Sequence, residues 1–122
     1  MNWQFSNSAP IYTQLIGQIR AGIVSGALAP GERLPSVRDL AMEAGVNPNT
    51  MQRALAELET QGLVETHRTS GRTVTENRQT VEDMKQALAR CCAGEYVKNM
   101  GRLGISQPEA ARMAAEYKEG SV

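Results

Sequence analysis

Apolar residues recur at helical spacing near the start of the chain. Between Ser8 and Gly26 they lie four residues apart, at Ile11, Leu15, Ile19 and Ile23. Because residues four apart share one face of an α-helix, we predict a core helix that opens at Ser8 and Pro10 and closes at Gly26. Trp3 and Phe5 precede it with strand-like alternation, and we expect both rings to fold back over the same core.

Two shorter amphipathic stretches follow in close succession. Residues 34–45 predict a helix that begins at the N-cap Ser36. Asn47 is a strong N-cap for the next helix, and Pro48 takes its first position, where a missing N–H is harmless. The buried face of this second helix has apolar residues at helical spacing: Met51, Ala54, Leu55 and Leu58. Because only Val46 separates the two helices, they must cross at a large angle, which predicts a helix-turn-helix.

The apolar period changes from helical to strand-like after Gly62. Residues 63–76 alternate apolar and polar side chains and predict two short strands, with "RTSGR" at the tip of a hairpin. Three helices followed by a hairpin form a winged helix-turn-helix. We therefore expect residues 1–76 to be a winged helix-turn-helix domain and the fold to be mainly α with a small β-hairpin.

Two further helices are predicted in the remaining segment, residues 77–122. Thr80 and Asp83 have the spacing of a capping box at the start of the first, and "SQPE", residues 106–109, caps the second. The first of these helices carries an apolar row: Met84, Leu88, Cys92, Tyr96, Met100 and Leu103. Such helices need a partner surface, so we expect a short C-terminal two-helix dimerisation segment that forms a homodimer. Packing of this segment onto the winged helix of the same chain is the alternative.

The charges do not by themselves indicate a nucleic-acid partner. The 122 residues include 13 lysines and arginines and 13 aspartates and glutamates, so the formal net charge is zero. Residues 1–76 hold six basic and seven acidic side chains, which makes the predicted winged helix slightly acidic. Any binding of double-stranded DNA must therefore depend on where the charges lie.

Several classes of function lack the residues that they need. No apolar run of about 18 residues and no signal peptide are present, so we expect a cytoplasmic protein without a membrane partner. Cys91 and Cys92 are adjacent and His67 is far away, which gives neither a disulfide framework nor a metal-ligand spacing. We favour buried thiols, with redox sensing at a dimer interface as the alternative. No catalytic triad, metal cluster or phosphate-cradling glycine loop has the right spacing, so we expect neither an enzyme nor a cofactor.

The helix that begins at Asn47 has an unusual exposed start. An ordinary solvated helix face, which is the alternative interpretation, is rich in glutamate and lysine, and this start has neither. Its outward side chains are Asn49, Thr50, Gln52 and Arg53. In a helix-turn-helix this start enters the major groove, where each base pair has a distinct donor and acceptor pattern. Asn49 can pair with adenine, Arg53 with guanine or a phosphate, and Thr50 with a phosphate or a thymine methyl. Gln52 is ambiguous, and Asn47 could add a phosphate contact to its capping role.

The start of the preceding helix is a candidate phosphate clamp. Ser36 and Arg38 lie there, and the free amides of the helix start would act together with the guanidinium. An ion pair of Arg38 with Glu32 or Asp39 is the alternative interpretation.

The hairpin tip is the second candidate for contacts with the DNA backbone. Arg68 and Arg72 flank Gly71, which predicts a wing that reaches a phosphate or the minor groove, with a plain surface turn as the alternative. Arg33 could belong to either site. We expect His67 to be a surface or strand-packing residue.

Residues 10–74 also resemble a known family, the GntR bacterial transcription regulators, in their N-terminal winged-helix domain. The most specific parts are "PGERLPSVRDLA" and "NPNTMQRALAELETQGLV". The Asn-Pro-Asn-Thr opening and the short remainder of the chain are similar to the YtrA-like branch, whose members are typically dimeric repressors. The resemblance strengthens Arg38, which matches the family's arginine at this position. Two departures concern base preference: the wing "TSGRTV" has one glycine where the family usually has two, and the recognition helix lacks the arginine that many relatives carry in its first turn.

The resemblance implies a sequence-specific DNA-binding transcriptional regulator, a repressor that binds a palindromic operator as a homodimer. A winged-helix protein-interaction module without specific DNA binding is the alternative. Residues 77–122 are too few to enclose a separate ligand-binding domain. Any small-molecule effector is therefore expected to act by changing the spacing of the two recognition helices through the dimer helices.

Overall fold

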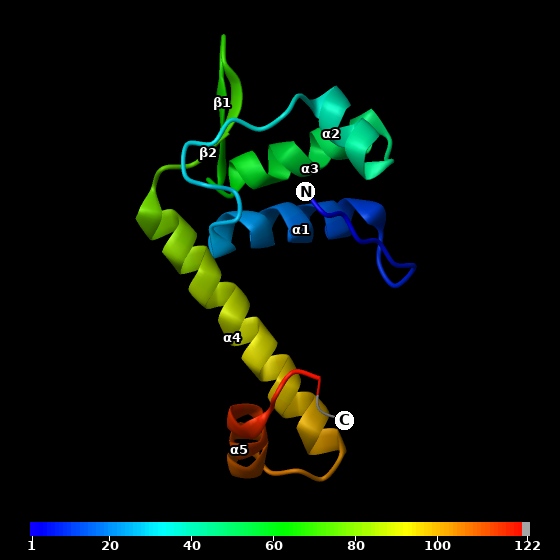
Figure 1. Cartoon of the computed structure of the whole chain (residues 1–122), viewed down its shortest axis with the longest axis vertical. Coiled ribbons are helices and arrows are strands. Elements are labelled where there is room, and N and C mark those ends of the chain that lie inside the picture. The colour runs from blue at the N-terminus through cyan, green and yellow to red at the C-terminus, as the bar shows by residue number, and fades with distance from the viewer. Residues whose placement is uncertain (121–122) are drawn as a thin grey trace. The chain divides into compact units, whose positions relative to one another are not determined.

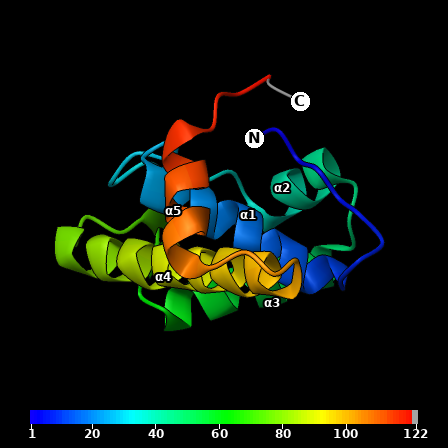
Figure 2. The same cartoon turned by 90° about the horizontal axis from the view of Figure 1, so that it is seen from below.

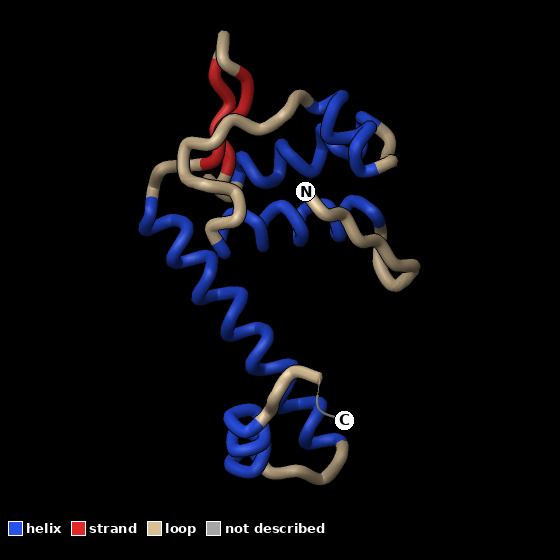
Figure 3. Tube along the Cα trace, viewed as in Figure 1, coloured by secondary structure: helices blue, strands red, loops and turns tan. Residues whose placement is uncertain are grey.

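The computed structural model describes residues 1–120, with five α-helices and one antiparallel hairpin (Figure 1). In chain order the elements are α1 (Ile11–Ser25), α2 (Val37–Ala44), α3 (Pro48–Thr60), β1 (Val64–His67), β2 (Gly71–Val74), α4 (Arg78–Arg102) and α5 (Gln107–Glu116). In the described part of the chain, strands are confined to the hairpin (Figure 3). The predicted fold class, mainly α with a small β-hairpin, is confirmed.

The chain forms two compact units, and α4 belongs to both of them. The first unit, Met1–Lys85, contains α1, α2, α3, the hairpin and the start of α4. The second unit, Gln86–Val122, contains the rest of α4 and α5. The boundary between the compact units therefore lies inside a helix, later in the chain than the predicted division at residue 76.

The core of the first unit lies between α1, α3 and the hairpin. Because apolar residues recur every three or four positions along both helices, each helix turns one continuous apolar face inward. Eight large apolar side chains of this region are essentially inaccessible to solvent: Leu15, Ile19, Met51, Leu55, Leu58, Leu63, Val64 and Val74. This core holds α3 against α1 and the hairpin, and so fixes which face of α3 remains exposed.

Two predictions for α1 are wrong. The helix begins after Pro10 without a side-chain cap, because the hydroxyl of Ser8 hydrogen-bonds with the hydroxyl of Ser6 instead of a helix amide. Ile11 is 37% exposed, whereas Ile16 is buried in the core. Ile11 instead lines a surface hollow, which the start of α3 also borders.

The N-terminal segment folds back over the core, as predicted. The rings of Trp3 and Phe5 stack with 6.0 Å between their centroids and pack against the buried cluster. Glu43 of α2 accepts hydrogen bonds from the α-ammonium of Met1 at 2.7 Å and from Nε1 of Trp3 at 3.2 Å. The hydrogen bond from the ammonium lowers the pKa of Glu43 below its ordinary value.

The helix-turn-helix has the predicted caps. The hydroxyl of Ser36 accepts the amide of Asp39 at 3.1 Å, and Oδ1 of Asn47 accepts the amide of Asn49 at 2.8 Å. Gly45 ends α2 with a φ of 71°, a left-handed conformation that glycine adopts without strain. The caps set where both helices begin, and the left-handed turn aims the start of α3 away from α2.

The hairpin has a third partner that the apolar pattern did not predict. β1 pairs with β2 in the register Val64↔Val74 to His67↔Gly71, and Arg33 forms an isolated bridge with Thr73. The amide of Leu34 donates to the carbonyl of Arg72 at 2.9 Å, and the amide of Val74 donates to the carbonyl of Glu32 at 2.9 Å. The segment before α2 is therefore fastened along the outer edge of β2.

The start of α4 also differs from its prediction. Asn77 caps the helix, because its Oδ1 accepts the amide of Thr80 at 3.1 Å. Asp83 does not reach back to an amide as in a capping box; its carboxylate accepts a hydrogen bond from Nε2 of Gln79 at 2.7 Å. Asparagine is among the best N-caps, and here it stops the helix from beginning later at Thr80.

In the second unit, α5 packs against the end of α4 (Figure 2). Ser106 caps α5, as predicted. The hydroxyl of Tyr96 donates to the carbonyl of Ala110 at 2.7 Å, and Ala110 is 1% exposed. By contrast, no residue of α4 is buried.

Candidate nucleic-acid interface

The exposed face of α3 contains the side chains that the sequence predicted. Asn49, Gln52 and Arg53 are exposed, and Thr50 is half-buried. Among the described residues, the side chains of Asn49 and Gln52 have no hydrogen-bond partner, so their amide groups remain available to a ligand. Asn49 and Arg53 are four residues apart and therefore lie on the same face of α3.

Asn47 has one part of its side chain engaged and the other available. Its Oδ1 accepts the amide of Asn49, which leaves the Nδ2 group free to donate. Asn47 and Thr50 line a surface hollow of about 500 Å³ together with Phe5, Ile11 and the turn at residues 44–46.

The start of α2 carries a free arginine beside free amides. Arg38 is exposed and forms no ion pair with any described residue; Glu32 instead accepts the amide of Ala29 at 2.9 Å. The first hydrogen bonds of α2 run from Asp39 and Leu40 to Ser36. The amides of Val37 and Arg38 are thus the unpaired donors of the helix start. They and the guanidinium are suited to bind an anion such as a phosphate.

Four of the predicted contact residues line one hollow of about 580 Å³ between the start of α2 and β2: Arg33, Ser36, Gly71 and Arg72. The pairing of residues 31–34 with β2 brings Arg33 to this place. Its Nε lies 3.9 Å from the point that a Cβ on Gly71 would occupy. Nε of Arg72 is buried and has no hydrogen-bond partner in the described part of the chain. The hollow therefore combines two arginines with Ser36 and a helix start, and Asp39 also lines it.

The distribution of ion pairs explains how a neutral chain can present unpaired positive charges. Within residues 1–76, five arginines have no side-chain hydrogen bond or ion pair with another described residue: Arg33, Arg38, Arg53, Arg68 and Arg72. Several carboxylates of the first unit have other partners, for example Glu59, which accepts a hydrogen bond from the hydroxyl of Thr66 at 2.7 Å. In the second unit, Arg112 pairs with Glu109 and Glu116. The first unit thus leaves its guanidinium groups free for an anionic partner.

One contact of the interface was not predicted. Cζ of Arg53 lies 4.5 Å from the centroid of the Tyr12 ring, which belongs to the first turn of α1. Tyr12 is half-buried and packs against the core. No local spacing could have shown this contact, because it joins two helices that are far apart in the sequence.

The remaining predicted residues lie outside both hollows. Arg38, Asn49, Gln52 and Arg53 line neither the hollow at α2 nor the one at Asn47. His67 is a hairpin residue, as predicted: its Nε2 lies 2.8 Å from Oγ1 of Thr73 on the paired strand.

The second unit exposes an apolar groove. It measures about 450 Å³ and is lined by Tyr96, Met100, Met113, Ala114 and Tyr117. Leu103 is 74% exposed and Tyr117 is 67% exposed. Of the predicted dimer residues, Met84, Leu88, Tyr96 and Met100 are half-buried and Cys92 is exposed. Cys91 is exposed as well, so the prediction of buried thiols is wrong for the single chain, in which no residue of α4 is buried.

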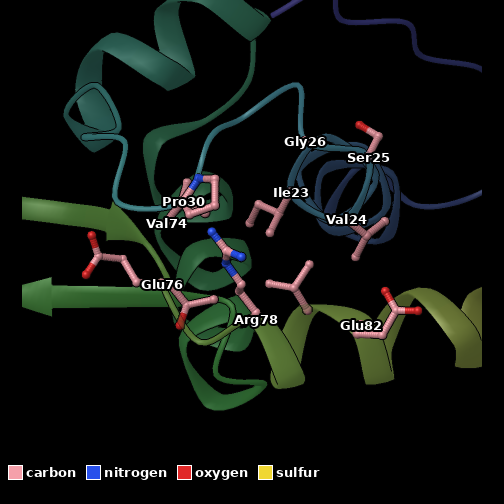
Figure 4. Close-up of a pocket in the computed structure, with 11 residues that line it drawn as sticks. Ile23, Val24, Ser25, Gly26, Pro30, Val74, Glu76, Arg78 and Glu82 are labelled. Atoms are coloured by element: carbon pink, nitrogen blue, oxygen red, sulfur yellow. The ribbon is translucent and has the colours of Figure 1, made fainter.

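A further hollow lies where α4 begins (Figure 4). It measures about 240 Å³ and lies among the end of α1, Pro30, residues 74–76 and the first turns of α4. This is smaller than the roughly 300 to 1,000 Å³ of typical small-molecule sites, and the charged residues on its rim are exposed: Glu76, Arg78 and Glu82. The hollow therefore does not indicate a ligand.

No described helix is long and apolar enough to cross a membrane. Within residues 1–120, no three or more histidine, cysteine or acidic side chains are grouped so that they could hold a metal ion.

Comparisons with known proteins agree with this geometry. Residues 11–74 match the family model described as bacterial regulatory proteins, gntR family. The chain is 40% identical over 120 residues to the uncharacterized HTH-type transcriptional regulator YhcF of Bacillus subtilis, covering 98% of this chain and 99% of the relative. It is 45% identical over 74 residues to the HTH-type transcriptional repressor YtrA of the same species, covering 61% of this chain and 57% of the relative.

Solved structures are similar over both the whole chain and its first part. A GntR family transcriptional regulator from Listeria monocytogenes matches with a TM-score of 0.86 and 34% identity, covering 93% of this chain and all of the other. The DNA-binding domain of AraR in complex with operator ORX1 matches with a TM-score of 0.53 and 26% identity, covering 62% of this chain and 92% of that domain.

Proposed function

The chain belongs to the gntR family of bacterial regulatory proteins, and within it to the YtrA-like branch of transcriptional regulators, and we propose that its two parts have different functions. Residues 1–76 bind double-stranded DNA in a sequence-specific way. Residues 77–122 join two copies into a homodimer. The dimer binds a palindromic operator and represses transcription there.

Three parts of the winged helix contact the DNA in this proposal. The start of α3 enters the major groove, where Asn49, Thr50 and Gln52 meet base edges or the groove wall. The start of α2 binds a backbone phosphate through Arg38 and its free amides. The hollow between α2 and β2 binds a phosphate next to it, through Arg33, Ser36, Gly71 and Arg72, while Asn47 adds a phosphate contact through its free Nδ2 group.

The free arginines are the observation on which this proposal chiefly rests. Five guanidinium groups in residues 1–76 have no hydrogen bond or ion pair with another described residue, although the chain contains as many acidic as basic residues. A guanidinium binds phosphate in a bidentate way and releases condensed counterions from DNA. The operator complex of the similar AraR domain supports the choice of DNA as the partner.

The apolar groove supports the homodimer. Met113 of α5 and Tyr117, which follows the end of α5, extend the predicted row of α4 residues, and Leu103 stands at the end of that row. A two-fold dimer places two reading heads at half-sites about one helical turn, or a multiple, apart. A signal that shifts the helices of the groove would change this spacing, so any small-molecule effector acts through them.

Selection from a pool of random DNA duplexes with the full chain at defined salt tests the proposal. The expected result is enrichment of a two-fold symmetric sequence, bound by a dimer in sedimentation. Arg38→Ala should weaken binding to every duplex and reduce the salt slope by about one, because one phosphate contact is lost.

Arg112→Ala is the matched control, because it removes the same charge from an arginine that is already ion-paired, and it should leave the slope unchanged. If no sequence is enriched, the winged helix is better explained as a protein-interaction module.

A further inference from the structure

We propose that Tyr12 is a positioning residue of the DNA interface, which holds the guanidinium of Arg53 against a backbone phosphate at the edge of the major groove. The inference rests on the proposed function and assigns a target to the one arginine of the exposed face of α3. Sequence alone left guanine and phosphate equally open for this side chain.

The contact has the geometry of a cation–π pair. Cζ of Arg53 lies 4.5 Å from the ring centroid of Tyr12, within the roughly 6 Å over which such pairs attract. Tyr12 is half-buried against the core, so its ring is held in place by packing, whereas Arg53 is exposed. The ring therefore restrains the arginine.

The pair leaves the donors of Arg53 available. Its guanidinium has no hydrogen bond or ion pair with another described residue, and its N–H groups all lie in its plane. A planar guanidinium that stacks on a ring keeps these donors free at its edge. Arg53 can therefore contact the Tyr12 ring and a phosphate at the same time.

The direction of the restraint favours phosphate over a base. Tyr12 belongs to α1, so the contact draws the guanidinium sideways, toward a neighbouring helix. Base edges lie at the floor of the groove, in front of the start of the recognition helix, and phosphates lie along its walls. A side chain held to the side of α3 is thus placed at the wall.

A double-mutant cycle on the full chain tests this assignment. The probes are a duplex enriched by the wild-type chain from a random pool and an unrelated duplex of the same length. Tyr12→Leu should weaken binding to both duplexes by about two- to tenfold and reduce the salt slope, because Arg53 must then be ordered on binding. Tyr12→Phe keeps the ring and should restore wild-type affinity. In an Arg53→Ala background, Tyr12→Leu should have no further effect.

Several results would overturn the proposal. An equal loss from Tyr12→Leu with and without Arg53 would show that Tyr12 acts independently of the arginine. A loss confined to the enriched duplex would show that Arg53 contacts a base. If Tyr12→Leu is not folded by circular dichroism, Tyr12→Met replaces it, because a flexible thioether fills irregular space without a π face. If a duplex is enriched but Tyr12 and Arg53 show no coupling, this inference alone fails. If no duplex is enriched, the proposed function fails as well.

Discussion

Asn47→Asp separates the capping role of Asn47 from its proposed place beside DNA. Oδ1 of Asn47 accepts the amide of Asn49 at 2.8 Å, and an aspartate can accept the same hydrogen bond. Aspartate is as good an N-cap as asparagine, and its charge is favourable at a helix N-terminus. We therefore expect the melting temperature of Asn47→Asp to equal or exceed that of the wild type. Asn47→Ala should instead lose about 1 kcal/mol of stability.

The same substitution should weaken DNA binding through charge repulsion. With the carboxylate held at the cap, a phosphate bridged by one water would lie about 6 Å away. The repulsion is then about 0.7 kcal/mol in a medium as polar as water and about 3 kcal/mol at an effective dielectric constant of 20. Because 1.4 kcal/mol is a factor of ten, the dissociation constant should rise between about threefold and 100-fold. The loss should be similar for every DNA sequence and shrink at high salt.

Ser106→Asp provides the matched control. Ser106 is also an N-cap whose side chain accepts a backbone amide, and it lies in the second unit. The substitution adds the same charge at the same kind of position, so both stability and DNA binding should stay unchanged. Thermal denaturation and fluorescence anisotropy with labelled duplexes measure the two properties. Wild-type affinity of a stable Asn47→Asp variant at low salt would refute the placement of the α3 start against DNA.

Three further predictions follow from other parts of the structure. Asn49→Ala should relax base preference at one position of each half-site by about 1 to 3 kcal/mol, measured by competition among single-base variants of the enriched duplex. Leu103→Glu should shift sedimentation toward a folded monomer, because Leu103 is 74% exposed in the single chain and its replacement disturbs only a partner surface. The lowered pKa of Glu43 adds stability above the ordinary carboxyl pKa that is lost as the pH falls through the lowered value. Glu43→Gln should therefore lower the melting temperature at neutral pH but not in acid.

The sequence by itself determined where most helices begin and which faces they bury. Ser36, Asn47 and Ser106 cap their helices as predicted, because a cap is a hydrogen bond between neighbours in the chain. The buried face of α3 followed from its apolar period for a similar reason, since 3.6 residues per turn place its side chains without reference to any partner. Local rules failed at Ser8 and Thr80, where a nearby polar group competed for the same role.

The tertiary structure decided what lies beside the exposed groups. Arg33 reaches Gly71 only because residues 31–34 pair with β2, and Tyr12 meets Arg53 only because α1 packs on α3. Tertiary packing likewise decides whether a carboxylate lies close enough to an arginine to form an ion pair. Contacts of this kind join segments that are distant in the chain, and they depend on the packed shape of the core, which no local period or spacing encodes. The winged helix was therefore predictable from the residues, whereas the unpaired arginines of a neutral chain could be identified only in the folded protein.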